Sequence, residues 1–463
     1  MSAVPTEVAR RATEPPRLLR VLDVGFGIAV VVGGTIGVGI LRTPGLVAAR
    51  LLDPWLIVGV WALGGAYALL DANCTTELAT LIPAAGGPYV FVRAAYGDFA
   101  GFVVGWGDWL QNSVALAFVA VALAESAVAL VGPLPGGTSP FAGLVLVVMT
   151  AVQLLGVRAG SAVQKWSSAV KTLAFVALIA ALFSSRGNGP GAPVGPALHA
   201  PVGGVGMLLG VVAAFRAVVT TYGGWNTAIY FAEEDTDPGH NLPRALLGGL
   251  LLISAIYVLT NAALLHVLSP AQLAASSFPV ATAAQAVFGG ASGQVVTALA
   301  LVSLVSILSA TSLMAPRVLY GLGRDGLFHR AVTRVSRGGT PITATLLTSG
   351  VAVALALAGT FDLLLALYAL IGVLAGVLVN ASLITLRRRW PERSRPYRAR
   401  GYPGSVALIL GLNALLAVGF VVDDPTSGVY ALAALAVTYP LYRLTRRSPL
   451  VARDGPVQSA DGH

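Results

Sequence analysis

Glycines interrupt the first long apolar stretch of the sequence. Residues 31–45, VVGGTIGVGILRTPG, carry glycines at positions 33, 34, 37 and 39. Glycine costs about 1 kcal/mol relative to alanine in a helix interior, so the cluster predicts either close helix packing or an unwound turn. An unwound turn frees N–H groups on one half-helix and carbonyl groups on the other, which suits a small ion or a zwitterion.

A second glycine pair lies inside a later apolar stretch. Gly223 and Gly224 are flanked by Tyr222 and Trp225. A break at this position would offer backbone carbonyls to an ammonium group and leave room for a side chain. The alternative is ordinary helix packing, in which the small residues permit close approach and the two aromatic rings fill the interior.

Lys171 is the most informative single residue. The chain has only two lysines, Lys165 and Lys171, beside 27 arginines. If both lie on one helix, Lys171 is about 9 Å deeper in the apolar layer than Lys165. A compact ammonium can lose its proton when desolvated, whereas a guanidinium cannot, so a coupling role is one interpretation. The other is a side chain that extends back to the membrane surface.

Hydroxyl and amide side chains recur at helical spacing in two other stretches. Ser303, Ser306 and Ser309 follow one another every three residues and could meet Lys171, with Ser306 taken as the coupling candidate. Their alternative role is hydrogen bonding between helices. Asp108 and Asn112 lie one turn apart on one helix face, where they could line a pathway with Asp108 as a proton carrier.

Other charged residues in apolar stretches are weaker candidates for binding cargo. Asp71 is a weak candidate for cargo contact, and Glu77 is expected to be structural near the inner membrane surface. Arg216 is expected either to steer anionic groups into a vestibule or to pair with Glu125. Glu233, Glu234 and Asp235 end one stretch, where all three are expected to pair with inner-loop arginines in a gate, with Glu233 and Glu234 as the gating residues.

The composition requires a membrane to position these residues. Among 463 residues, 56% are hydrophobic and 11% are charged, which excludes a soluble protein of several domains. The pattern predicts an all-α polytopic membrane protein with 12 transmembrane helices. They are expected near 22–42, 55–81, 99–131, 140–157, 162–183, 203–232, 244–268, 283–315, 341–359, 362–386, 404–422 and 428–443.

The basic residues alternate by loop and fix the expected orientation. With both termini cytoplasmic, nearly all Lys and Arg fall on the inner side. The exceptions are Arg42, Arg50 and Arg186 outside, with Lys171 and Arg216 inside the membrane. The formal net charge of +9 is therefore explained by topology, and no nucleic-acid partner is expected. The basic run 387–400 would also attract anionic lipid head groups.

Four motifs, in order along the chain, resemble amino acid permeases of the amino acid, polyamine and organocation superfamily, close to the bacterial relatives of L-type amino acid transporters. They are ELATLIPAAGGPYVFVRAAYG (77–97), YGGWNTAIYFAEE with NLPRAL (222–246), APRVLYGLGRDGLF (315–328) and RPYRARGYP (395–403). The resemblance implies a five-plus-five inverted repeat with discontinuous helices 1 and 6, plus two appended helices. In that fold the glycine pairs of helices 1 and 6 meet near the bilayer midplane.

The resemblance also divides the chain into regions. A cytoplasmic N-terminal tail covers 1–20 and the transport core covers 21–403. Repeat one spans about 21–185 and repeat two about 203–386, followed by helices 11 and 12 in 404–446 and a cytoplasmic tail in 447–463. Within the core, the stretch 83–102 is expected to form a short interfacial or re-entrant helix.

The resemblance assigns roles to the first break and to Lys171. The substrate carboxylate would bind backbone amides of the IGxGI turn, here Ile36, Gly37, Val38, Gly39 and Ile40. Relatives commonly have Ser or Thr where this chain has Val38, so a hydroxyl contact is absent. Lys171 matches a lysine that in sodium-independent relatives occupies the place of a sodium ion between segments 1, 5 and 8.

The resemblance describes the second break too. Relatives often place an aromatic gate two residues before the tyrosine, where this chain has Thr220 followed by Thr221. A roomier or more polar pocket is therefore expected. The substrate-binding set is completed by Asn112, Tyr222, Gly223, Gly224 and Trp225.

These features predict a plasma-membrane amino acid transporter that works by alternating access. We expect neutral cargo and sodium-independent transport, driven by protons or by exchange. One alternative is a cationic amino acid or polyamine carrier, in which Asp108 or Asp71 contacts the cargo. An alternative of another class is an amino-acid-binding membrane sensor, although the loops and tails are short for a signalling protein.

Several chemistries are excluded. Gly321, Gly323 and Gly326 spell GxGxxG, but no strand precedes them and they are expected in a loop after a membrane helix. The five histidines show no metal-ligand spacing and no nucleophile motif appears, so we expect no enzyme, no metal and no cofactor other than coupling protons. The single cysteine, Cys74, lies in an apolar stretch, so no disulfide-linked heavy chain is expected.

Overall fold

The computed structural model describes residues 18–133, 135–185, 204–276, 278–290, 292–358, 361–423 and 436–445, with positions 429 and 433. Within these ranges the chain is helical, and its only β-type contacts are two isolated bridges, Leu22 with Asp235 and Val335 with Pro341. Most of the two predicted tails, Arg186 and much of the predicted helix 428–443 lie outside the described residues.

The helices follow the predicted order with shifted ends. The first half of the chain contains α2 (Val24–Thr35), α3 (Val38–Leu51), α4 (Pro54–Leu81), α5 (Tyr89–Tyr96), α6 (Asp98–Val131), α7 (Thr138–Leu154), α8 (Val157–Ser184) and α9 (Gly204–Thr221). The short helix expected within 83–102 is therefore confirmed as α5. Among the described residues, seven helical spans are long and apolar enough to cross a membrane, and the bent pair formed by α2 and α3 would make an eighth.

The second half begins with two irregular helical turns. They are the 3₁₀ helix η1 (Trp225–Phe231) and, after α10 (Pro238–Pro243), the π-helical turn η2 (Arg244–Gly248). The remaining helices are α11 (Gly249–Val267), α12 (Pro270–Ala275), α13 (Pro279–Phe288), α14 (Ser292–Arg324), η3 (Arg330–Thr333), α15 (Ile342–Ala358), α16 (Phe361–Arg389), α17 (Gly404–Asp423) and α19 (Thr438–Thr445).

One predicted segment was wrong in its limits. The stretch 283–315 is not a single helix, because α13 ends at Phe288 and α14 runs from Ser292 to Arg324. The first two glycines of the GxGxxG match, Gly321 and Gly323, consequently lie inside α14, whereas a loop was expected. Only Gly326 lies in the following turn, with φ of +73°.

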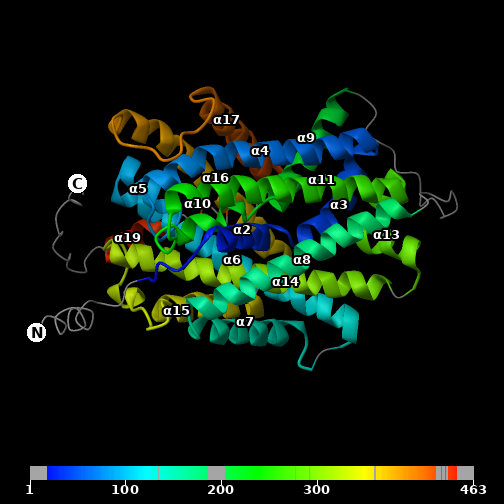
Figure 1. Ribbon diagram of the computed structural model, residues 1–463, viewed down its shortest axis with the longest axis horizontal. Helices are drawn as coiled ribbons and strands as arrows, with labels where there is room; N and C mark the ends of the chain where they lie inside the picture. Colours follow the sequence, from blue (N-terminus) through cyan, green and yellow to red (C-terminus); the bar gives the residue numbers. More distant parts are fainter. Residues whose placement is uncertain are drawn as a thin grey trace, which may run out of the picture.

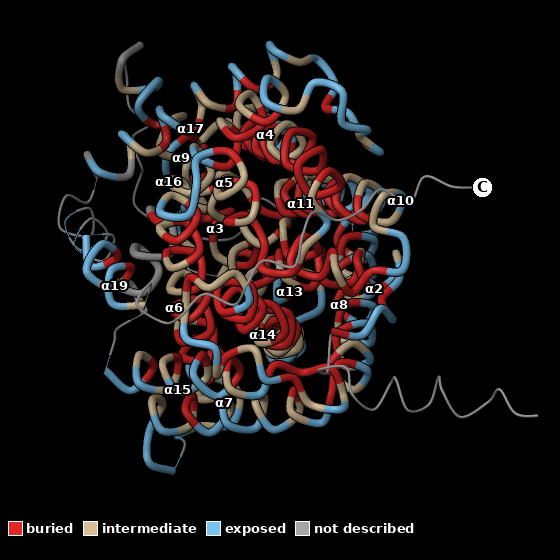
Figure 2. Tube along the Cα trace, turned by 90° about the vertical axis from the view of Figure 1, so that its left-hand side faces the viewer, coloured by how far each residue is buried: buried red, intermediate tan, exposed pale blue. Residues whose placement is uncertain are grey.

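The long helices lie side by side along one direction (Figure 1), with α5 and α10 at one end and α13 at the other. We call these the α5 end and the α13 end. Viewed along the bundle, buried residues gather around α14, whereas α17 and α19 lie at the periphery (Figure 2). Exposed apolar residues on the outer surface of such a bundle suit contact with lipid.

Helix α8 illustrates this division between a lipid-facing and an interior face. Trp166 and Leu173 are 74% and 69% exposed. On the opposite face, Gln164, Ser168 and Lys171 are buried. The polar side chains therefore point into the protein and the apolar ones point outward, the reverse of a helix on a water-soluble protein.

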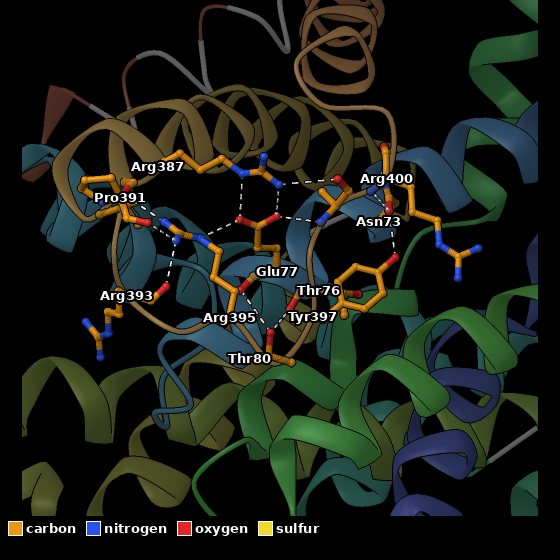
Figure 3. Close-up of polar contacts among 12 residues, drawn as sticks. Asn73, Thr76, Glu77, Thr80, Arg387, Pro391, Arg393, Arg395, Tyr397 and Arg400 are labelled. Atoms are coloured by element: carbon orange, nitrogen blue, oxygen red, sulfur yellow. Dashed lines mark hydrogen bonds and ion pairs between the residues drawn. The ribbon is translucent and has the colours of Figure 1, made fainter. Parts of the chain in front are cut away.

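A buried carboxylate joins α4, α16 and the segment after α16 at the α5 end (Figure 3). Glu77 accepts hydrogen bonds from Arg387 Nε at 2.9 Å and from the Ala399 amide at 2.6 Å, and it forms an ion pair with Arg395 Nε at 3.0 Å. Glu77 has no exposed surface. Two arginines of the basic run 387–400 are thus committed to Glu77, which reduces the set that was expected to face lipid head groups.

Candidate functional site at the two helix breaks

The first predicted break is present and short. Helix α2 ends at Thr35 and α3 begins at Val38, and the segments Val24–Thr35 and Gly39–Leu51 are bent by 46°. Gly37 lies in the break, but Gly39 lies inside α3, so the unwound turn is shorter than the expected IGxGI turn of Ile36 to Ile40. A Cβ on Gly39 would lie 2.8 Å from Thr221 Cγ2, so this glycine permits close packing of α3 on α9.

The second break meets the first. Helix α9 ends at Thr221, and Gly224 has φ of +97°, a left-handed conformation that favours glycine. A Cβ on Gly224 would lie 2.4 Å from the Gly34 carbonyl oxygen. The backbones at the two breaks are therefore in contact, as the pairing of glycine-interrupted spans predicted.

Lys171 satisfies two carbonyls at the end of α2. Its Nζ donates to the carbonyl oxygens of Gly33 at 2.9 Å and Ile36 at 2.6 Å, and the side chain has no exposed surface. The last carbonyls of a helix have no N–H donor inside the helix. The ammonium therefore takes the place of the N–H donors that further helical residues would have supplied. The side chain does not extend back to the membrane surface.

Tyr257 on α11 connects the carbonyl ends of both interrupted spans, a contact that the sequence did not suggest. Its hydroxyl lies 2.9 Å from the Thr35 carbonyl and 3.2 Å from the Thr221 carbonyl. The ring packs edge to face against Trp61 and Tyr222. A hydroxyl has one proton, so at any moment it can donate to only one of the two carbonyls.

The first turn of α3 offers N–H groups across the break from these carbonyls. Gly37 precedes the helix and has no side chain to cap it. The expected set of five amides must be reduced by one, because the Ile36 amide donates to the Val32 carbonyl at 3.0 Å. The other amides of the set precede the first N–H group that can donate to a carbonyl inside α3; they are those of Gly37, Val38, Gly39 and Ile40.

Both breaks open into a cavity of about 1440 Å³. The predicted site residues that line it are Gly37, Gly39, Asp108, Asn112, Thr220, Thr221, Tyr222, Gly223, Gly224 and Trp225. The cavity continues along α3 to Arg42 and Arg50 and reaches Ser276, beyond α12. It therefore extends toward the α13 end of the bundle.

Asp108 lies in the cavity wall, where it belongs to a small cluster of hydrogen-bonded side chains. Its Oδ1 accepts from Tyr230 Oη at 2.7 Å and from Asn112 Nδ2 at 3.1 Å, so the predicted shared face of Asp108 and Asn112 is confirmed. Asp108 Oδ2 is buried and has no hydrogen-bond partner among the described residues. Tyr230 was not among the predicted site residues, although it lies in the YGGWNTAIYFAEE motif, three residues before Glu233.

The serines of α14 do not bond to Lys171. Ser306 Oγ lies 3.3 Å from Ser168 Oγ, and Ser168 donates to the Ala29 carbonyl at 2.7 Å. Ser303 and Ser309 have buried hydroxyls without partners in the described part of the chain. Of the two expected roles, Ser306 therefore takes that of hydrogen bonding between helices, because it joins α14 to α8 beside Lys171 without a direct contact with the ammonium.

Ion pairs close the α5 end. Glu234 forms a buried ion pair with Arg317, and Glu233 pairs with Arg324 while accepting from the Ala85 amide at 2.9 Å. Both arginines belong to α14, which corrects the expectation that the partners lie in loops. Asp235, which was also expected to pair with an arginine, forms no ion pair in the described part of the chain and instead accepts from the Asn241 side chain and the Asp237 amide, both at 2.7 Å.

A second pair of contacts reinforces this end. Arg93 on α5 forms an ion pair with Asp325 at 2.6 Å, and Tyr89 donates to Asp325 at 3.0 Å. Burial alone would lower the pKa of Arg93, but Asp325 and Asp98 outweigh it and hold the pKa above its ordinary value. Helix α5 is thereby tied to the turn that follows α14.

Arg216 and Glu125 differ in their surroundings. Arg216 lines the cavity, and a Cβ on Gly419 of α17 would lie 3.1 Å from its Cδ. Glu125 on α6 is exposed. Whether the two pair or Arg216 steers anionic groups stays a prediction.

The chain is similar in sequence to a known protein family and to several known proteins. A family model described as amino acid permease matches residues 27–440. The serine/threonine exchanger SteT of Bacillus subtilis is 27% identical over 94% of this chain and 99% of its own length. The human b(0,+)-type amino acid transporter 1 is 26% identical over 86% of this chain and 82% of its own. The branched-chain amino acid permease BcaP of Lactococcus lactis is 25% identical over 89% and 92%.

Proposed function

Since the chain belongs to the amino acid permease family, we propose that it carries neutral amino acids across the plasma membrane by alternating access, without sodium. The family and the relatives named above are transporters, so the chain is not an enzyme. The two interrupted spans and the cavity between them provide the proposed binding site. Protons are the only coupling ions in this proposal, and no cofactor takes part.

The helices form two inverted repeats of five in this proposal. Repeat one spans about 21–185 and repeat two about 203–386, with helices 11 and 12 appended. Support comes from the contact between the breaks, because Gly34 and Gly224 belong to the first and sixth apolar segments. Inverted repeats bring such segments together near the bilayer midplane.

An amino acid zwitterion matches the polarity of the two breaks. The α-carboxylate accepts from the free amides at the start of α3, which need no buried cationic side chain. The α-ammonium donates to carbonyls near Tyr222, Gly223 and Gly224. Tyr257 adds support, because its single proton leaves either the Thr35 or the Thr221 carbonyl needing a donor.

Sodium independence depends on Lys171. This proposal is carried by one observation, the Lys171 ammonium at 2.6 Å and 2.9 Å from two carbonyls of the first break. A cation is thus already built into the position where a sodium ion would neutralise those carbonyls. Loss and gain of the Lys171 proton would then couple cargo movement to protons, whereas a permanently protonated lysine would suit exchange.

The ion pairs at the α5 end form the inner gate in this proposal. Glu233 and Glu234 hold η1 against α14 while the cavity extends to the α13 end. The α5 end is cytoplasmic in this proposal, which also assigns both termini to the cytoplasm, and the basic residues near this end support the orientation. Cys74 is buried and unpaired, so it offers no disulfide to a heavy chain.

Uptake by purified protein in liposomes tests the proposed function. Labelled neutral, cationic and anionic amino acids would be measured with and without an inward proton gradient, and with empty or preloaded vesicles. Stimulation by the gradient would indicate proton coupling, and uptake only into preloaded vesicles would indicate exchange. Binding without uptake under every condition would contradict transport and favour a sensor.

A further inference from the structure

The outer part of the cavity carries a row of guanidinium groups. We call it the outer vestibule and define it by lining residues from α3, α6, α9 and the start of α13, namely Arg42, Leu46, Arg50, Phe118, Arg216 and Phe278. The sequence places few Lys or Arg residues outside the membrane or within it. Arg42, Arg50 and Arg216 are among those few, and all three line this vestibule.

The three arginines follow the path from the cavity mouth to the breaks. Arg50 is exposed near the end of α3, about 18 Å along the helix axis from Val38. Arg42 lies about 6 Å along the same axis from Val38, and Arg216 lies about 8 Å before the end of α9 at Thr221. A group that enters from the α13 end therefore passes Arg50 before it reaches Arg42 and Arg216.

The acidic residues that line the cavity lie outside the vestibule. Among the described residues they are Asp71 and Asp108. Asp108 lies about 15 Å from Phe118 along α6, toward the α5 end. Asp71 lies about 9 Å beyond Gly65 along α4 in the same direction, and an added Cβ on Gly65 would lie 3.0 Å from Tyr222 Oη beside the second break. The described lining of the vestibule therefore carries positive charge only.

Two carboxylates near the outer helix ends also stay out of this lining. Asp53 caps α4, where it accepts from the Leu56 amide at 2.8 Å, and Glu125 is exposed on α6. Neither of them lines the cavity. An anion that enters the vestibule thus meets three arginines and no competing carboxylate among the described lining residues.

The other residues that define the vestibule are apolar. Leu46 and Phe118 offer a hydrocarbon surface, and the Arg42 guanidinium lies 4.6 Å from the centre of the Phe278 ring. A guanidinium has five N–H donors, so an arginine can keep its contacts with the protein and still donate two hydrogen bonds to a carboxylate. The combination of cationic and apolar groups selects an anion with an apolar body.

The cavity has room for a ligand beyond the two breaks. Its volume of about 1440 Å³ exceeds the roughly 300–1000 Å³ of pockets that enclose a drug-sized ligand. A small amino acid at the breaks leaves the vestibule unfilled. A ligand without an amino group has no donor for the carbonyls at the breaks, so the vestibule holds it better than the breaks do.

We propose that the outer vestibule is a binding site for monocarboxylates that have an apolar body and no amino group. The carboxylate accepts hydrogen bonds from the arginine side chains, and the body packs against Leu46, Phe118 and Phe278. Such a ligand enters from the α13 end and is bound but not carried, so it obstructs the path from the mouth to the breaks. The site is separate from the proposed cargo site, and binding to it needs no transport.

Equilibrium binding of labelled 3-phenylpropanoate to the purified protein tests the proposal on the unaltered chain. Unlabelled 3-phenylpropanamide keeps the apolar body without the charge, and acetate keeps the charge without the body. Each should compete at least tenfold more weakly than unlabelled 3-phenylpropanoate. Competition by the amide or by acetate as strong as that of 3-phenylpropanoate would overturn the proposal, and so would the absence of saturable binding.

Substitution of the arginines distinguishes the vestibule from the amides at the start of α3. Arg42→Gln should weaken 3-phenylpropanoate binding at least tenfold, and Arg50→Gln at least threefold. Arg398→Gln removes one guanidinium from an exposed position of the segment after α16 and serves as the matched control, with unchanged binding. Unchanged binding in both vestibule variants would overturn the proposal. The competition series needs no substitution, so it decides the matter where a variant does not fold.

The vestibule and the proposed function fail separately. Binding of 3-phenylpropanoate with the expected selectivity, without uptake of any amino acid into liposomes, would support the vestibule and contradict transport. Uptake of amino acids without binding of 3-phenylpropanoate would overturn the vestibule and leave the proposed function intact.

Discussion

The Lys171 ammonium lies 2.6 Å from the carbonyl oxygen of Ile36, the residue that directly follows α2 in the first helix break. The same ammonium reaches the Gly33 carbonyl at 2.9 Å. A helix end that would otherwise need a bound ion or water is therefore neutralised by a side chain of the neighbouring α8. We infer that this lysine takes the place of a coupling sodium ion.

Replacing Lys171 by Met should abolish net uptake or its dependence on the proton gradient, while the protein stays folded. Methionine keeps the side-chain length but leaves two carbonyls without a donor. Uptake into liposomes and elution as a single species would be measured together. Lys165→Met is the matched control, because Lys165 is exposed and pairs with Asp23 at 2.9 Å. Transport by Lys171→Met with an unaltered pH response would contradict the coupling role.

Replacing Tyr257 by Phe should destabilise the empty protein and strengthen cargo binding. The ring contacts with Trp61 and Tyr222 remain, but the carbonyls of Thr35 and Thr221 lose their donor. An unsatisfied buried acceptor costs about 1–3 kcal/mol, and the cargo ammonium can supply the missing donor, so KM should fall by roughly 5- to 150-fold. A purely structural role would also lower the melting temperature but leave KM unchanged.

Tyr96→Phe is the control for the Tyr257 variant. The Tyr96 hydroxyl accepts from Thr385 at 3.1 Å at an exposed position. It lies on α5, away from the two breaks, so KM should remain as in the unaltered protein.

Neutralising one partner of the Glu234–Arg317 pair should destabilise the protein. Both side chains are almost fully buried, and removal of one leaves an uncompensated charge, at a cost of about 3–5 kcal/mol. Thermal unfolding of Glu234→Gln in detergent would measure the loss. The double variant Glu234→Gln with Arg317→Met should recover part of it. Glu233→Gln breaks a more exposed pair with Arg324 and should cost less.

The Asp23–Lys165 contact predicts a pH-dependent contribution to stability. Burial alone would raise the pKa of Asp23, but the Phe26 amide and Lys165 outweigh it and hold the pKa below its ordinary value. A lowered pKa stabilises the folded state above the unfolded pKa of about 4, and the effect is lost as pH falls through the folded value. Asp23→Asn should therefore be less stable than the unaltered protein at pH 7, and the difference should shrink toward pH 3. A constant difference across this range would contradict the charge effect.

The sequence predicted local features better than contacts between distant helices. Glycine clusters located both breaks, and the depth of Lys171 within an apolar stretch indicated a buried ammonium. By contrast, Tyr257 and Tyr230 stood out by neither composition nor spacing, because their importance comes from contacts with helices far away in the sequence.

The partners of charged groups were also hard to foresee. Glu234 was expected to meet an arginine in a loop, but its partner Arg317 lies inside an apolar helix that runs past its predicted end. A direct contact between one of the α14 serines and Lys171, which was one of two expected roles, is not made for a related reason. Helical spacing gives the shared face of three serines but not the rotation of α14 relative to α8.

The initial rate of amino acid uptake into liposomes, with sodium present and with sodium replaced by choline, decides whether Lys171 replaces a sodium ion. The ammonium already occupies the carbonyls of Gly33 and Ile36. The rate should therefore agree within about twofold between the two media at a fixed proton gradient. A rate that falls at least tenfold when sodium is removed would contradict the assignment of the coupling position to Lys171.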